Sequence, residues 1–195
     1  MWTGTDTQYK INNLRKIFAI FDVPESELVF YLKDEDNSET VAGNRYEIRK
    51  KYWEYTLPQL KNAFSENGLF GNVNPVTSNW IAGFVGIPGI HIDCVANFDE
   101  SRVELYLGMA SKEKNKELFG FLFARKDNIE EVIGTQLIWS RMDDNKASKI
   151  HTFLPGVDIS KDIDWPRMAK FHVDASKKLY LAFKEHLEQY FHISL

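Results

Sequence analysis

The chain has 195 residues, of which 44% are hydrophobic and 14% aromatic, and its formal net charge is −4. A chain of this length buries roughly 70% of the surface that its unfolded form exposes, so the fold requires neither a metal nor a disulfide. The acidic balance argues against a strongly basic nucleic-acid coat protein, while a local basic patch stays compatible with it.

The single cysteine and the absence of long apolar runs indicate the cellular compartment in which we expect the protein. Cys94 is the single cysteine, so it cannot form an internal disulfide or a cysteine metal cluster, which suits a reducing cytosol. The N-terminus lacks the basic stretch and apolar run of a secretory signal. The longest nearly apolar run, residues 80–90, is far shorter than the ~20 residues that span a bilayer. We therefore expect a cytoplasmic protein without a membrane partner.

The N-terminal part of the chain is predicted to be an appendage. Residues 6–21 carry apolar side chains at helical spacing. Residues 27–33 are β-prone and fit either a short edge strand or a continuation of the helix, and the polar run 34–44 predicts a linker or mobile loop. We therefore expect residues 1–44 to form a helical appendage and linker, and residues 45–195 to form one domain.

The predicted domain begins with a helix and a meander. A helix is expected over residues 45–67, where Pro58 should kink it or divide it in two. Three strand-like runs follow in residues 79–108. A Gly-Ile-Pro-Gly turn at residues 86–89 separates the first two, and a short polar reversal at residues 99–101 precedes the third. This pattern predicts an antiparallel meander with one buried face.

The second half of the domain alternates helices and strands. Residues 111–134 predict one helix, bounded by a serine N-cap and a glycine stop. Two further strands are expected at residues 136–141 and 148–154, and a long amphipathic helix begins at residues 164–166. The predicted class is therefore α+β, with about five strands in an antiparallel-rich sheet and helices packed on it.

Five motifs occur in order along this domain: RVELYLG (102–108), KELFGFLFARKDNIEEVIG (116–134), QLIW (136–139), KASKI (146–150) and DWP (164–166). With these motifs the chain resembles a bacterial and archaeal family of unknown function. In larger members of that family, this domain often stands behind a restriction-endonuclease-like domain. The resemblance implies a context of DNA defence or nucleic-acid handling, and it implies no established activity. The first 44 residues lie outside it and are too short to be a nuclease domain.

The element order also matches the core of PD-(D/E)XK nucleases, which hold a divalent metal with an acidic residue on the second strand and an acid-x-Lys triplet on the third. Asp93 and Glu104 supply two such carboxylates for Mg²⁺ or Mn²⁺, and both are expected to face the helix over residues 45–67. Tyr106 stands where the lysine belongs, and Lys112 is a candidate to replace it. The alternative is a solvated or salt-bridged carboxylate pair on the exposed face of the sheet.

A mixed basic and aromatic segment, RYEIRKKYW, opens the domain. Arg45, Arg49 and Lys50 lie within about one helical turn of one another, so they form a candidate nucleic-acid-binding patch. The alternative is a solvated face of an amphipathic helix whose aromatic side chains point inward.

The remaining polar residues give no catalytic set. His172 and His186 lie ~21 Å apart along one helix and cannot bind one ion. His91 and His151 are interpreted as isolated structural residues of strands, and Cys94 as a buried, inert thiol. No nucleophile elbow or phosphate-binding glycine loop is present in the sequence. We therefore predict no cofactor, except Mg²⁺ or Mn²⁺ under the nuclease alternative.

Three hypotheses for the function follow. The leading one is a non-catalytic binding or interaction module that acts with nucleic acid or a defence-system protein. The second is a divergent metal-dependent nuclease that uses Asp93 and Glu104. The third is a protein-interaction domain without nucleic-acid contact, such as a homodimer formed through the exposed face or edge of the sheet, where Trp80, Trp139 and Tyr106 offer an aromatic surface.

Overall fold

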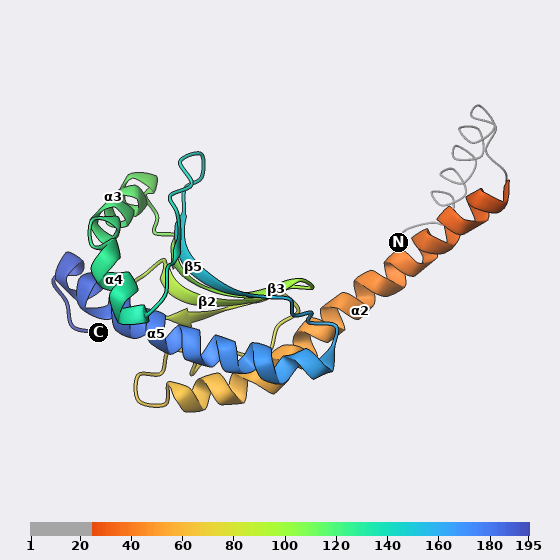
Figure 1. Cartoon of the computed structure of the whole chain (residues 1–195), viewed down its shortest axis with the longest axis horizontal. Helices are drawn as coiled ribbons and strands as arrows, with labels where there is room; N and C mark the ends of the chain where they lie inside the picture. The colour runs from red at the N-terminus through yellow and green to blue at the C-terminus, as the bar shows by residue number, and fades with distance from the viewer. Residues whose placement is uncertain (1–24) are drawn as a thin grey trace. The chain divides into compact units, whose positions relative to one another are not determined.

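The computed structural model describes residues 25–195, and their side chains from residue 44 onward. The chain divides into two units, Met1–Tyr46 and Glu47–Leu195. The second unit contains a five-stranded sheet, and α5 and the second half of α2 pack against one face of it (Figure 1). The predicted α+β class is therefore confirmed.

The sheet is antiparallel throughout, and its strand order is β1-β2-β3-β5-β4. The predicted meander and the two later strands are all present: β1 (Trp80–Phe84), β2 (Ile90–Ala96), β3 (Glu100–Leu107), β4 (Ile138–Ser140) and β5 (Ser148–Pro155). Strand β5 pairs with β3, so the sheet continues beyond the meander on the β3 side.

The turn between β1 and β2 depends on glycine, as the sequence predicts. Gly86 and Gly89 have φ angles of +90° and +80°, in the region that other residues rarely adopt. A Cβ atom on Gly89 would lie 2.7 Å from the Cα atom of Met109, so a side chain there would collide with the backbone that follows β3.

Helix α2 (Glu25–Ala63) is longer than the predicted helix of the domain. The loop expected at residues 34–44 lies inside α2, and so does the segment 27–33, which continues the helix. Residues 25–44 contain no proline and a single glycine, so their polar composition alone does not end a helix. Pro58 lies within α2 and does not divide it. The predicted helix over residues 6–21 falls outside the described residues.

The single helix predicted over residues 111–134 is two helices, α3 (Lys112–Phe123) and α4 (Lys126–Ile133). At Arg125 the backbone leaves the helix, and its N–H bonds the carbonyl three residues back. The carbonyl of Phe121 is then freed, and the Arg125 guanidinium donates to it at 2.9 Å while lying 3.6 Å over the Phe121 ring. This side chain satisfies the orphan carbonyl and stabilises the break.

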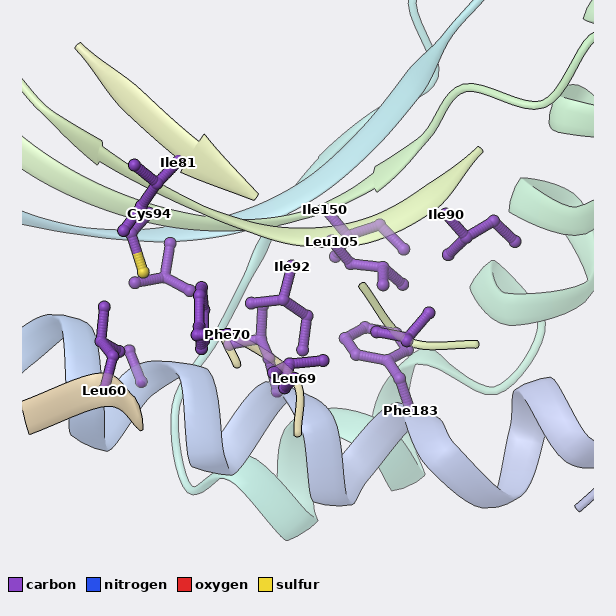
Figure 2. Close-up of a cluster of buried hydrophobic side chains, with 14 of the residues drawn as sticks. Leu60, Leu69, Phe70, Ile81, Ile90, Ile92, Cys94, Leu105, Ile150 and Phe183 are labelled. Atoms are coloured by element: carbon purple, nitrogen blue, oxygen red, sulfur yellow. The ribbon is translucent and has the colours of Figure 1, made fainter. Parts of the chain in front are cut away.

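The core lies between the sheet, α5 (Trp165–Phe191) and the second half of α2 (Figure 2). Side chains from all three layers meet there, among them Leu60, Phe70, Ile92, Leu105, Ile150 and Phe183. Cys94 is fully buried in this core, and burial raises the pKa of its thiol to about 12. The prediction that this thiol is buried is therefore confirmed.

His172 is a buried residue of α5 that joins three elements. Its Nε2 lies 3.1 Å from the carbonyl oxygen of Val95 on β2, and because a carbonyl only accepts, Nε2 carries the proton. Its Nδ1 therefore accepts the hydroxyl of Tyr52 on α2, at 2.8 Å. The ring also stacks on Trp53 with 5.7 Å between the ring centroids. The neutral imidazole thus connects α2, α5 and β2.

We expect the free energy of unfolding to decrease as the pH falls from about 6.5 to about 4. Burial lowers the pKa of His172 to about 4, whereas its pKa in the unfolded chain is about 6.5. The unfolded chain therefore binds more protons in this window, and the loss of stability is on the order of 3 kcal/mol. Urea unfolding at a series of pH values checks this.

The control for this experiment separates the two histidines whose pKa falls to about 4, His172 and His151. Both contribute to the same pH window, so His172→Gln should lose part of the pH dependence and His151→Gln another part. An unchanged pH dependence in His172→Gln would show that this residue is not held neutral by its burial.

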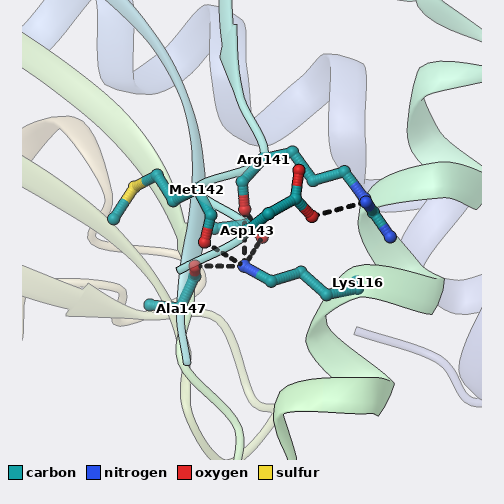
Figure 3. A network of polar contacts seen from close by, with 6 residues as sticks. Lys116, Arg141, Met142, Asp143 and Ala147 are labelled. Carbon is teal, nitrogen blue, oxygen red and sulfur yellow. Dashed lines mark hydrogen bonds and ion pairs between the residues drawn. The ribbon is translucent and has the colours of Figure 1, made fainter. Parts of the chain in front are cut away.

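Lys116 on α3 holds the connection between β4 and β5 (Figure 3). Its ammonium donates to the carbonyl oxygens of Met142 at 2.9 Å and Ala147 at 2.6 Å, and to that of Arg141. It also lies 2.9 Å from the hydroxyl oxygen of Ser148. All three N–H groups of the ammonium are therefore used within the protein. Lys116 has a structural role.

Replacing Lys116 by methionine should lower the free energy of unfolding by about 2–4 kcal/mol, because the buried carbonyl of Ala147 and the partly buried carbonyls of Arg141 and Met142 lose their donor. The matched control is Lys114→Met, an exposed lysine of the same helix, which should stay within about 0.5 kcal/mol of the parent. Chemical unfolding followed by circular dichroism measures both. Equal stabilities of the two variants would contradict the structural role of Lys116.

Candidate functional site

Alternation along the strands gives the sheet a core face and a second face, which we call the open face. Ile92 on β2 and Leu105 on β3 point into the core (Figure 2). Their neighbours in sequence therefore point to the opposite side. In Figure 1 the helices of this unit lie on the core side of the sheet. The open face is thus where the sheet itself presents side chains to the surroundings.

The strand register arranges the open face in three rows that run across the strands. The central row contains Ala82, Asp93, Glu104, His151 and Ile138. One flanking row contains Trp80, Val95, Arg102 and Phe153. The other contains Phe84, His91, Tyr106, Lys149 and Ser140. Charged groups gather in the middle of this surface, and large apolar side chains lie at its margins.

Two carboxylates form the centre of the open face. Asp93 and Glu104 are paired across β2 and β3, and only 5% and 6% of their surfaces are exposed. Glu104 Oε2 lies 2.9 Å from Nε of Arg102 and 3.6 Å from Nζ of Lys149. Asp93 Oδ1 lies 2.6 Å from Nδ1 of His91. Each carboxylate is therefore held by groups of the flanking rows, which agrees with the salt-bridged alternative and not with a solvated one.

Burial also shifts the protonation of this centre. It raises the pKa of the Asp93 carboxyl; the hydrogen bond to His91 opposes this rise, and the nearby Glu104 carboxylate adds to it. Burial and the Arg102 charge lower the pKa of His151 to about 4. His151 is therefore neutral at pH 7, and no described residue forms a hydrogen bond with its buried Nδ1.

Aromatic rings border the carboxylates. The rings of His91 and Tyr106 stack with 4.9 Å between centroids and 14° between planes. Trp80, in the opposite flanking row, is 47% exposed. Between these rings lies a pocket of about 360 Å³ over Asp93 and Glu104, which we call the sheet pocket. Its lining combines stacking rings, two carboxylates and one guanidinium.

The nuclease hypothesis expected the two carboxylates to face α2, and the structure shows that they do not. Asp93 and Glu104 lie on the opposite face of the sheet, because the apolar residues of β2 and β3 occupy the alternate positions that point toward the helices. Glu47 and Glu54 are exposed on α2, where each pairs with a lysine of the same helix. Among the side chains that the structure describes, residues 44–195, no three from histidine, cysteine or acidic residues are grouped so that they could hold a metal ion.

The other residues of the nuclease hypothesis lie in two places. Tyr106 lines the sheet pocket, two residues after Glu104 and therefore on the same face of the sheet. Lys112 lies in the exposed first turn of α3, where its charge acts on Lys116, and it does not line the sheet pocket. The structure therefore brings together Asp93, Glu104 and Tyr106. The metal assignment to the two carboxylates stays a prediction.

The basic patch and the aromatic surface of the other hypotheses are also located. Arg45, Arg49 and Lys50 lie on α2; Arg45, in the first unit, and Lys50 are exposed, whereas Arg49 is half-buried. Trp139 does not share a face with Trp80, contrary to expectation. It occupies a core-side position of β4, where its ring contacts Phe119, Phe123 and Phe183 and its Nε1 donates to Glu130.

Three contributors to the site were missed from the sequence. His91 was interpreted as isolated, and neither Arg102 nor Lys149 was considered. The signal for two of them is local: His91 precedes Asp93 by two positions, and Arg102 precedes Glu104 by two. In a strand, residues two apart point to the same face. No such signal exists for Lys149, which is far from the carboxylates in sequence.

The fold and the site define a class, an α+β domain whose antiparallel sheet presents paired charges and stacking rings on its open face. Residues 48–187 match a family described as "Domain of unknown function (DUF4268)". Because this match covers more than half of the chain, the protein belongs to that family. The match includes every strand of the sheet. No curated protein and no solved structure matches the chain.

The family match confirms one sequence prediction in its coarse form, membership of a family of unknown function. The association with restriction-endonuclease-like proteins stays a prediction. Among the described helices, none is both long and apolar enough to cross a bilayer.

Replacing Arg102 by methionine should lower the free energy of unfolding by about 2–4 kcal/mol, because Glu104 stays buried with Lys149 as its remaining cation. The exposed Arg167→Met on α5 is the control and should stay within about 0.5 kcal/mol. The double variant Arg102→Met/Glu104→Gln should recover about 1 kcal/mol or more. Additive effects of the two single changes would contradict a coupled pair.

Proposed function

We propose that this domain is a non-catalytic binding module, and that its ligand is single-stranded nucleic acid on the open face of the sheet. The observation that supports this is the stacked ring pair of His91 and Tyr106, together with the half-exposed Trp80, beside Arg102 and Lys149. Proteins that bind single strands combine stacking rings with cations. Open antiparallel sheets are one known platform for stacked bases.

The margins of the open face extend this surface. Phe84 on β1 is 58% exposed and Phe153 on β5 is 43% exposed, so further rings lie on both sides of the sheet pocket. Every base has a flat face that can stack on such rings, so stacking does not depend on the sequence of the strand. The open face therefore offers several stacking positions. In the predicted patch on α2, by contrast, the ammonium of Lys50 lies 3.9 Å from the carboxylate of Glu54 and is paired within the helix.

The family resemblance supports the context of this proposal. Such a module would act in the cytoplasm of a bacterium or an archaeon, in nucleic-acid handling or defence, next to a nuclease. Binding of this kind requires no cofactor. The alternative occupants of the open face are a defence-system protein or a second copy of this chain, and the experiments below distinguish them from nucleic acid.

The test of the ligand class is fluorescence anisotropy with labelled single-stranded DNA, single-stranded RNA and duplex DNA, each of about 12 nucleotides per strand. We expect single strands to bind more tightly than the duplex. Affinity should fall steeply between about 50 mM and about 200 mM salt, because phosphate contacts release counterions. Absence of binding to any strand at low salt would overturn the proposal.

Trp80→Ala and Tyr106→Ala should each weaken single-strand binding by about 5- to 100-fold, because a stacked base contributes roughly 1–3 kcal/mol. The matched control is Tyr46→Ala, an exposed ring on α2, which should bind as the parent does. Lys149→Ala should weaken binding and lessen its salt dependence, whereas Lys177→Ala, exposed on α5, should not. Equal affinities of the sheet variants and their controls would place the ligand elsewhere.

A divergent metal-dependent nuclease is the second candidate, and the adjacency of Asp93 and Glu104 on neighbouring strands favours it. We expect no cleavage of plasmid, single-stranded DNA or RNA in the presence of Mg²⁺ or Mn²⁺. Cleavage that disappears in Glu104→Ala would overturn the non-catalytic proposal and make Tyr106 and Lys112 the next targets. Cleavage that survives this change would come from a different site.

A further inference from the structure

We propose that the sheet pocket selects guanine, whose N1–H and N2–H groups would donate to the carboxylates of Asp93 and Glu104. This inference rests on the proposed function, because the guanine belongs to a single strand bound on the open face. It adds a base preference to a surface whose rings alone would bind any sequence.

The first argument is the supply of acceptors at the bottom of the pocket. Asp93 uses Oδ1 to bind His91, and Glu104 uses Oε2 to pair with Arg102 and Lys149. Oε2 of Glu104 is nevertheless a buried oxygen that forms no hydrogen bond with the described residues. Both side chains line the pocket, and only 7% and 8% of their side-chain surfaces are exposed. Acceptors buried to this degree gain from a ligand that brings N–H groups.

The second argument is charge. The two carboxylates of the pocket lie beside the guanidinium of Arg102 and the ammonium of Lys149, and Arg102 also pairs with Glu100 at 3.2 Å. Three carboxyl groups therefore share two cationic side chains, and much of the Coulomb attraction is already used within the protein. The remaining acceptor oxygens suit an uncharged ligand with N–H donors and flat faces. Nucleobases combine these properties.

The third argument is the pattern of donors on each base. Guanine presents two neighbouring donors, N1–H and the N2 amino group, on its Watson–Crick edge, which proteins recognise in single strands. Adenine and cytosine present one amino group next to a bare ring nitrogen, whose lone pair would face the carboxylates and repel them. Uracil and thymine present one N–H between two carbonyl oxygens. Two adjacent carboxylates therefore match guanine and oppose the other bases.

The fourth argument is the shape of the pocket. Along β3, Arg102 and Tyr106 are four residues apart, so the two flanking rows are separated by about 13 Å. Between them the central row begins with the short side chains of Ala82 and Asp93. This leaves a slot bordered by Trp80 on one side and by the stacked Tyr106 ring on the other. Its volume of about 360 Å³ accommodates one purine.

The experiment measures binding of the full chain to a labelled pyrimidine strand that carries one central guanine. Matched strands replace that guanine by adenine or by inosine, which lacks the N2 amino group. We expect the guanine strand to bind about 5- to 150-fold more tightly than the adenine strand, with inosine in between. Asp93→Asn should bring the guanine and adenine strands to similar affinities.

Two further variants keep this test decisive. Asp99→Asn changes an exposed acidic residue in the turn between β2 and β3, so it should keep the guanine preference. Glu104→Gln should lose the preference as Asp93→Asn does, and it replaces that variant if Asp93→Asn fails to fold. A guanine preference that survives in both Asp93→Asn and Glu104→Gln would overturn the assignment to this pocket.

The outcomes separate this inference from the proposed function. Single-strand binding with equal affinity for all three strands overturns the guanine inference and leaves the binding module in place. Absence of binding to every strand overturns both. In that case, binding of an arginine-rich peptide that weakens in Asp93→Asn would identify a protein partner for the pocket.

Discussion

The hydrogen bond from His172 to the carbonyl of Val95 connects the core to the open face of the sheet. It fixes β2 to α5, and the hydroxyl of Tyr52 fixes the same imidazole to α2. The side chain of Val95 lines the sheet pocket on the other side of the strand. Because a slip of one residue in β2 would exchange its two faces, a contact that fixes this strand also fixes which residues form the pocket.

Charge compensation is the second constraint, and it determines which side chains surround the carboxylates. A buried carboxylate is strongly unfavourable unless cations and donors accompany it. Arg102 satisfies this requirement from the same strand as Glu104, and Lys149 does so from the neighbouring strand. The cations that compensate Glu104 thus come from the sheet itself, and Arg102 pairs in addition with Glu100 of the same strand.

The sequence predicts local elements well and their interruptions poorly. Turn glycines and alternating apolar residues locate the meander, and the same alternation in β2 already separates Ile92 from Asp93. The break between α3 and α4 escapes prediction because it depends on where the Arg125 side chain bonds, not on a glycine or proline. The pairing of β5 with β3 joins residues about 45 positions apart, so the place of Lys149 beside Glu104 has no local signal.

Tyr106 distinguishes the two candidate functions most directly. At the third position of an acid-x-Lys triplet, tyrosine is unfavourable for catalysis, because a phenol supplies no positive charge to a phosphate. On the open face the same residue favours base stacking, since its ring stacks on His91 at the edge of the sheet pocket. The same position that weakens the nuclease hypothesis thus strengthens the binding hypothesis. The Glu104 carboxylate beside it is paired with Arg102 and Lys149, and the Asp93 carboxylate is hydrogen-bonded to His91. Both features favour recognition of a strand over its cleavage.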